Sequence, residues 1–147
     1  MHRRRHFKPG QAATELALVA PVLAVLLVGT ADFARAFYFH QEVIAAARAG
    51  AQYGSQSTTT AADTSGISTA ALANGTNVPG LTASSSVCTC GAPPPQTACG
   101  TGYCNGANVQ SSYITVTASA AFNTLVNYPG IPHTTTMSGT AIMQIQP

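Results

Sequence analysis

A single glutamate interrupts a long apolar stretch near the start of the chain. Between Gln11 and Ala31 the one charged side chain is Glu15, which lies five residues after Gly10. A carboxylate in a hydrocarbon layer is costly unless it is protonated or paired with a cation, so such a residue is usually functional. The pattern therefore predicts that a cation from elsewhere binds Glu15. The alternative is that Glu15 only snorkels to the aqueous interface.

Cysteines form the second candidate cluster. Cys88, Cys90, Cys99 and Cys104 fall within 17 residues. Their even number and the export predicted below favour two disulfides, although a Cys88–Cys90 bond is disfavoured because a C-x-C ring is strained. Zinc is the alternative, but the spacing C-x-C-x8-C-x4-C lacks the C-x2-C pairs of structural zinc sites. We therefore predict a disulfide-stapled loop over residues 88–104 and no metal site.

The remaining residues offer little material for catalysis. Beyond residue 54 the only acidic or imidazole side chains are Asp63 and His133, so a Ser-His-Asp triad has no support beyond availability. His2 and His6 stand in the first ten residues, and the chain has no G-x-x-x-x-G-K motif and no tryptophan. These absences argue against an enzyme and predict no cofactor.

Positive charge is concentrated at the N-terminus. Arg3, Arg4, Arg5 and Lys8 lie in the first ten residues, and Asp63 is the last charged side chain of the sequence. Charged residues make up 7% of the chain, against about 25% in a typical soluble protein. The net charge of +2 therefore belongs to the leader. No basic patch remains for nucleic acid, so we predict no nucleic-acid partner.

The apolar stretch itself has the length of a membrane span. Residues 11–31 would extend about 30 Å as a helix, which matches the hydrocarbon core of a bilayer. Basic residues precede the stretch, and none follows it before Arg35, so the rule that cytoplasmic flanks are positive predicts a cytoplasmic N-terminus. The rest of the chain would then lie outside the inner membrane.

The helical pattern continues through residues 32–54 as an amphipathic extension. We predict one helix from near Gln11 to near Tyr53, with Gly50 and Gly54 marking its frayed end. Side chains on the side opposite the apolar face include Arg35, Glu42 and Ala49. The predicted apolar face consists of Phe33, Phe37, His40, Ile44, Ala47 and Ala51.

Residues 55–147 are predicted to form a small domain. Its first part, residues 55–87, is rich in Ser, Thr and Gly, with solvated stretches at 58–60 and 84–86 and a short helix at 65–73. Apolar and polar residues alternate in 113–122 and again in 137–145, which predicts a C-terminal hairpin over 112–146. We expect an α+β fold in which the long helix packs on a small antiparallel sheet.

Four motifs in order resemble one known family. They are Gly10-Gln11-Ala12-Ala13-Thr14-Glu15, residues 16–21 (LALVAP), residues 31–35 (ADFAR) and residues 45–51 (AAARAGA). Together they resemble the N-terminal helix of TadE-like proteins, minor pseudopilins of the tight-adherence (Flp, type IVc) pilus machinery. Leu16 departs from the tyrosine that core members often have there. The resemblance implies a pilin-like architecture and a role in assembling a pilus for adhesion or secretion.

The resemblance also implies specific sites and partners. A prepilin peptidase would cut between Gly10 and Gln11, which makes residues 1–10 a leader. Glu15 would be the fifth-position glutamate that such peptidases and filaments use. The other implied partners are pilus subunits, assembly-platform proteins of the bacterial inner membrane, and the lipid bilayer. The single-pass protein would keep residues 55–147 outside the cytoplasm or carry them into an extracellular pilus.

Three alternatives concern the N-terminal segment and the role of the chain. The leader is cut after Gly10, or a signal peptide is cut after Ala36, or the segment remains as an uncut anchor. The second is disfavoured because its apolar region would exceed the usual length of about 7–15 residues and because Arg35 would lie beside the cut. In the first case the new α-amino group of Gln11 could pair with Glu15 of a displaced neighbour and set the stagger. A rival function is a membrane-anchored binding module that never enters a filament.

Overall fold

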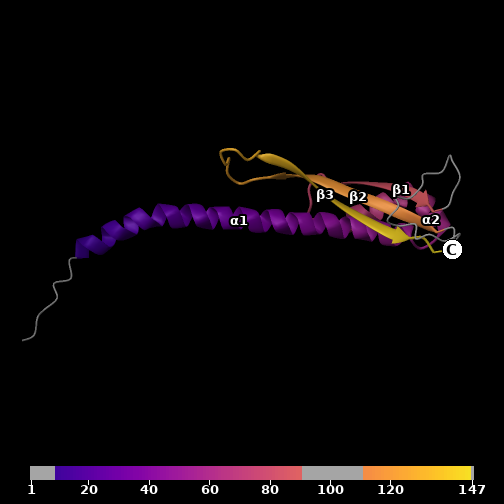
Figure 1. The fold of residues 1–147 in the computed structure, drawn as a ribbon, viewed down its shortest axis with the longest axis horizontal. Helices are drawn as coiled ribbons and strands as arrows, with labels where there is room; N and C mark the ends of the chain where they lie inside the picture. The colour runs from indigo at the N-terminus through magenta and orange to yellow at the C-terminus, as the bar shows by residue number, and fades with distance from the viewer. Residues whose placement is uncertain (1–8, 91–110, 147) are drawn as a thin grey trace, which may run out of the picture. The chain divides into compact units, whose positions relative to one another are not determined.

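The computed structural model describes residues 9–90 and 111–146. The chain divides into two compact units, which we call the first unit (Met1–Arg35) and the second unit (Ala36–Pro147). The ribbon in Figure 1 shows the order of elements along the chain. These elements are α1 (Pro9–Gly54), α2 (Thr58–Ala62), α3 (Thr64–Asn74), β1 (Thr82–Thr89), β2 (Ser112–Asn123) and β3 (Thr134–Gln144). The predicted α+β class is confirmed.

The second unit is built around a three-stranded antiparallel sheet of order β1-β2-β3. Residues of β2 alternate between buried and more exposed along most of the strand. In register, Val116 lies opposite Ser85 of β1 and Ala141 of β3. This is the expected arrangement for a sheet with one face on a core and one face toward solvent.

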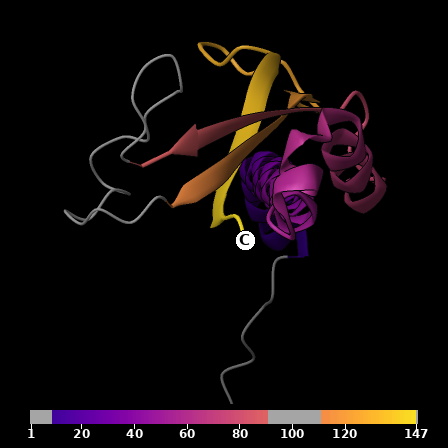
Figure 2. The same ribbon diagram turned by 90° about the vertical axis from the view of Figure 1, so that its right-hand side faces the viewer.

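The C-terminal part of α1 packs on the buried face of this sheet. Figure 2 shows the strands crossing beside α1, with α2 and α3 at the helix end. Phe39 of α1 contacts Phe122 of β2 edge to face, with ring centroids 5.4 Å apart. The core cluster comprises Val43, Ala46, Ala47, Ala51, Ala61, Ile67, Val78, Leu81, Ile114, Val116, Ala118, Ala120, Ala141 and Ile145.

Small residues bring α1 and the sheet into close approach. A Cβ on Gly50 would lie 3.1 Å from both the carbonyl oxygen of Ile67 and Cγ1 of Val116. A Cβ on Gly54 would lie 2.9 Å from Cδ1 of Ile114. The predicted end of the helix at Gly54 is confirmed, but the predicted fraying was wrong, because Gly50 and Gly54 are both buried against neighbouring elements.

The predicted apolar face of α1 was only partly right. Ala47 and Ala51 are fully buried, and His40 and Ile44 are half-buried. Phe33 and Phe37, however, are 75% and 60% exposed. The side of α1 that faces the sheet carries small side chains, because alanine and glycine allow the backbones of helix and sheet to approach closely. A pattern based on hydrophobicity instead assigns the largest apolar residues to the buried face. The residues of α1 that the second unit buries are Val43, Ala46, Ala47, Gly50, Ala51 and Gly54.

Two elements in the Ser/Thr-rich region were missed. The stretch predicted to be solvated at 58–60 begins α2, whose N-cap Ser57 accepts a hydrogen bond from the backbone N–H of Thr60 at 3.1 Å. The stretch at 84–86 lies inside β1, where Ser85 pairs with Val116. Serine has low strand propensity, and here pairing with β2 overrides it. The helix predicted over 65–73 is found as α3.

Asp63 joins α1 and α3 through its carboxylate, and its backbone N–H caps α2 by donating to the carbonyl oxygen of Thr60 at 3.2 Å. It caps α3 by accepting hydrogen bonds from the backbone N–H of Gly66 at 2.9 Å and from the hydroxyl of Ser65 at 2.8 Å. The hydroxyl of Tyr53 on α1 donates a third hydrogen bond at 2.9 Å. These bonds, led by the one from Gly66, hold the pKa of Asp63 below its ordinary value.

The lowered pKa predicts a pH-dependent stability. A carboxyl whose folded pKa is depressed stabilises the fold above its unfolded pKa and loses that contribution as the pH falls through the folded value. We expect Asp63→Asn, which keeps a good N-cap but removes the charge, to lower the melting temperature at pH 7. The difference from wild type should begin to shrink below about pH 4, where the carboxyl of the unfolded chain takes up a proton, and should disappear once the pH is also below the lowered pKa of the folded state. Thermal unfolding followed by circular dichroism between pH 2 and 7 measures this, and a difference that persists unchanged at pH 2 would contradict it.

Candidate processing and assembly site

The predicted processing residues lie in the first turn of α1. The helix begins at Pro9, a position that suits proline because the first helical N–H has no intrahelical partner. A Cβ on Gly10 would meet nothing within 4 Å, so a side chain at this position would point into open space. Residues 1–8, which include the basic cluster, lie outside the described residues. The structure brings Gly10, Gln11 and Glu15 within about one turn of each other.

Glu15 has a local hydrogen-bond donor. The side-chain amide of Gln11 donates to Oε1 of Glu15 at 3.2 Å, one helical turn away. The hydroxyl of Thr14 donates to the carbonyl oxygen of Gln11 at 2.8 Å. An amide is neutral, so the bond from Gln11 orients the carboxylate without neutralising it. Glu15 is exposed on the helix surface, where a cation from another molecule can approach it.

The rest of the first unit exposes an apolar surface around the helix. Among the described residues, α1 is the one helix that is long and apolar enough to cross a membrane. No other described residue of the first unit covers these side chains, and a helix that is apolar all round needs lipid or protein neighbours. The nine large residues, each between 41% and 77% exposed, are Leu16, Leu18, Val19, Val22, Leu23, Val25, Leu26, Leu27 and Val28.

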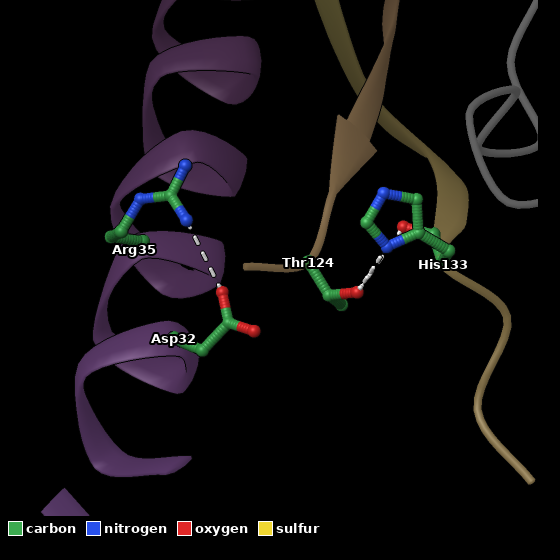
Figure 3. A network of polar contacts seen from close by, with 4 residues as sticks. All are labelled: Asp32, Arg35, Thr124 and His133. Carbon is green, nitrogen blue, oxygen red and sulfur yellow. Dashed lines mark hydrogen bonds and ion pairs between the residues drawn. The ribbon is translucent and has the colours of Figure 1, made fainter. Parts of the chain in front are cut away.

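Two polar pairs lie outside this apolar segment, and Figure 3 shows each of them. In α1, Arg35 Nη1 lies 3.3 Å from Oδ1 of Asp32, an i,i+3 ion pair within one turn of the helix. The side chain of Asp32 is 5% exposed, so this partner helps to offset the cost of a buried charge. Between β2 and β3, the hydroxyl of Thr124 lies 3.0 Å from Nδ1 of His133. Sequence patterns gave no signal for this second pair, because it depends on how the loop closes.

The predicted staple falls largely outside the described residues. Cys88 is half-buried on β1, and Cys90 just after it is 6% exposed. Neither is a free thiol. Cys99 and Cys104 lie outside the described residues, so no described contact supports the stapled loop, and it remains a prediction. Within residues 9–90 and 111–146, no three His, Cys, Asp or Glu side chains are grouped as metal ligands.

Fold and site together define a small α+β protein with an N-terminal apolar helix that could anchor it in a membrane. Residues 10–52 match the family model described as TadE-like protein. The match starts at Gly10, includes Glu15 and covers nearly all of α1, in agreement with the resemblance drawn from the four sequence motifs. No curated protein and no solved structure was found to match the chain.

Proposed function

We propose that this chain is a minor pseudopilin of a tight-adherence (Flp-type) pilus system. A prepilin peptidase cuts it after Gly10, and α1 then anchors it in the inner membrane until it joins pilus subunits. The observation that carries the proposal is the TadE-like match over residues 10–52, which contains the whole apolar segment of α1 together with Gly10, Gln11 and Glu15. The role is structural rather than catalytic, and the partners are the peptidase, pilus subunits and assembly-platform proteins.

The contacts around Glu15 support a role in filament assembly. Cleavage at Gly10 converts the backbone nitrogen of Gln11 into a cation at the start of a helix. In a filament, the Gln11 amine of one subunit meets the Glu15 carboxylate of a staggered neighbour, which removes two uncompensated charges from the apolar layer. The exposed apolar surface of residues 16–28 supplies the packing area for this contact.

The outer part of the protein completes the proposal. Basic residues at 3–8 keep the N-terminus in the cytoplasm, and the second unit lies on the other side of the membrane. In that oxidising compartment Cys88, Cys90, Cys99 and Cys104 form two disulfides that staple the segment between β1 and β2.

The N-terminal residue of the mature protein tests the proposal. We expect Gln11 at the N-terminus of protein from native membranes, and Met1 or an uncut leader when the prepilin peptidase is deleted. Mass spectrometry of the N-terminal peptide from the two strains measures this. A start at Phe37 would indicate an ordinary signal peptide, and a leader retained in both strains would indicate an uncut anchor; either result contradicts the proposal.

A further inference from the structure

The loop between β2 and β3 exposes apolar side chains on an ordered turn. We call residues 124–133 the tip loop. Leu125, Val126 and Ile131 are 59%, 45% and 57% exposed, and the tip loop has no Asp, Glu, Lys or Arg. This surface is more apolar than that of a hairpin loop exposed to water, since such loops are typically polar.

The tip loop satisfies part of its own backbone. The N–H of Thr124 donates to the carbonyl oxygen of His133 at 2.9 Å, and the N–H of Ile131 donates to that of Tyr128 at 3.1 Å. The second bond closes a turn with Pro129 and then Gly130 at φ +85°, the residue order that a type II turn requires. These hydrogen bonds lower the free-energy cost of moving the loop from water into the interfacial layer of a bilayer, because fewer backbone groups there lack a partner.

Contacts within the second unit fix which end of the sheet carries the tip loop. Ile114, near the start of β2, lies beside Gly54 at the end of α1. Phe122, near the end of β2, lies against Phe39, close to Ala36, where α1 enters the second unit. The tip loop begins two residues after Phe122. It therefore lies at the end of the second unit by which the chain enters (Figure 1).

Chain length limits how far that end can be from a bilayer. The predicted span ends at Ala31, and the second unit begins at Ala36. Five residues reach at most about 17 Å even when fully extended. The entry end of the second unit is therefore held near the headgroup layer, whatever the orientation of the unit.

We propose that the tip loop is a second membrane contact of this protein, in which Leu125, Val126 and Ile131 enter the interfacial layer of the leaflet from which the span emerges. The inference rests on the proposed anchoring by residues 11–31. Lipid suits this surface better than a second copy, because a stable protein interface needs about 800 Å² on each partner, more than three loop side chains provide. Such a contact would hold the second unit down on the membrane before assembly.

Tryptophan fluorescence tests this contact, since the natural chain has no tryptophan. The full chain with Ile131→Trp is reconstituted at low density into phosphatidylethanolamine/phosphatidylglycerol vesicles, with or without lipids brominated on their acyl chains. Leu125→Trp is the second probe. Gln56→Trp is the matched control, because Gln56 is exposed and follows Gly54 at the opposite end of the sheet. We expect brominated lipid to quench both probes at least about threefold more strongly than the control. A side chain in the interfacial layer lies about 5–10 Å deep, at the boundary with the brominated acyl chains, whereas the control stays in water.

Each other outcome counts against the contact in a different way. Equal quenching of probes and control would overturn it while leaving anchoring intact. A blue-shifted but unquenched probe would mean that a second copy covers the tip loop, which also overturns it. Extraction of the chain from the vesicles by alkaline carbonate would show that residues 11–31 do not anchor it, and the inference would then fail together with the anchoring. Strong quenching of the probes together with an uncut leader in cells would support the membrane contact and contradict only the pseudopilin proposal.

Discussion

Replacing Glu15 with alanine is expected to reduce incorporation of the protein into pili by about a hundredfold or more. The change leaves the Gln11 amine of a neighbouring subunit uncompensated in an apolar layer. Removing one partner of a buried ion pair costs about 3–5 kcal/mol, and each 1.4 kcal/mol is about a factor of ten in an equilibrium constant. Quantitative immunoblotting of sheared pili against the membrane pool measures incorporation.

Two further variants separate charge from shape. Glu15→Gln keeps the size and one hydrogen-bond acceptor but not the charge, so we expect it to behave like Glu15→Ala. Glu42→Ala removes a carboxylate from the part of α1 within the second unit and should leave incorporation near normal. The mature N-terminus is determined for each variant, so that a defect in cleavage is not mistaken for a defect in assembly.

The same variants distinguish the two proposed classes of protein. Normal incorporation of Glu15→Ala would contradict the pairing of Glu15 with an amine. A membrane-anchored binding module would tolerate this change and instead lose its ligand when the segment from Cys88 to Cys104 is disrupted. The pseudopilin proposal predicts the reverse: Glu15→Ala should impair function more than disruption of the segment from Cys88 to Cys104.

Introducing a side chain at Gly139 is expected to destabilise the second unit strongly. A Cβ there would lie 2.8 Å from Cα of Ile44 and 3.0 Å from its backbone nitrogen. These are backbone atoms of α1, so no rotamer change can relieve the overlap, and β3 must move away from the helix. Overpacking of a core usually costs about 1–3 kcal/mol, and we place Gly139→Val at or above the upper end.

The neighbouring residue provides the control for Gly139→Val. Ser138 is exposed on the opposite face of β3, so Ser138→Val adds the same side chain to the same strand without meeting α1. Thermal unfolding of the full chain in detergent should show a melting temperature several degrees lower for Gly139→Val, about 4–8 °C per kcal/mol in a domain of this size. Equal melting temperatures for the two variants would contradict the close approach of β3 to α1.

Gly139 also illustrates what sequence patterns could and could not give. The alternation in 137–145 placed Gly139 correctly on the inward face, because the two-residue repeat of a strand is a local property. The pattern said nothing about why this position is glycine. That reason is Ile44, which is 95 residues earlier in the chain and meets Gly139 only after folding.

The sequence by itself determined the long apolar helix, the α+β class, the inward residues of β2 and the resemblance to TadE-like proteins over α1. Each follows from spacing or composition within one short segment. Only the tertiary structure decided which face of α1 is buried, because small side chains at Ala46, Gly50 and Gly54 allow close packing that the larger Phe33 and Phe37 do not. Only the tertiary structure also showed that residues 82–89 form a strand. The strand forms because it pairs with β2, as Ser85 does with Val116, and a serine-rich sequence does not predict this pairing. The physical reason is the same in both cases: the deciding contacts join residues that are far apart along the chain.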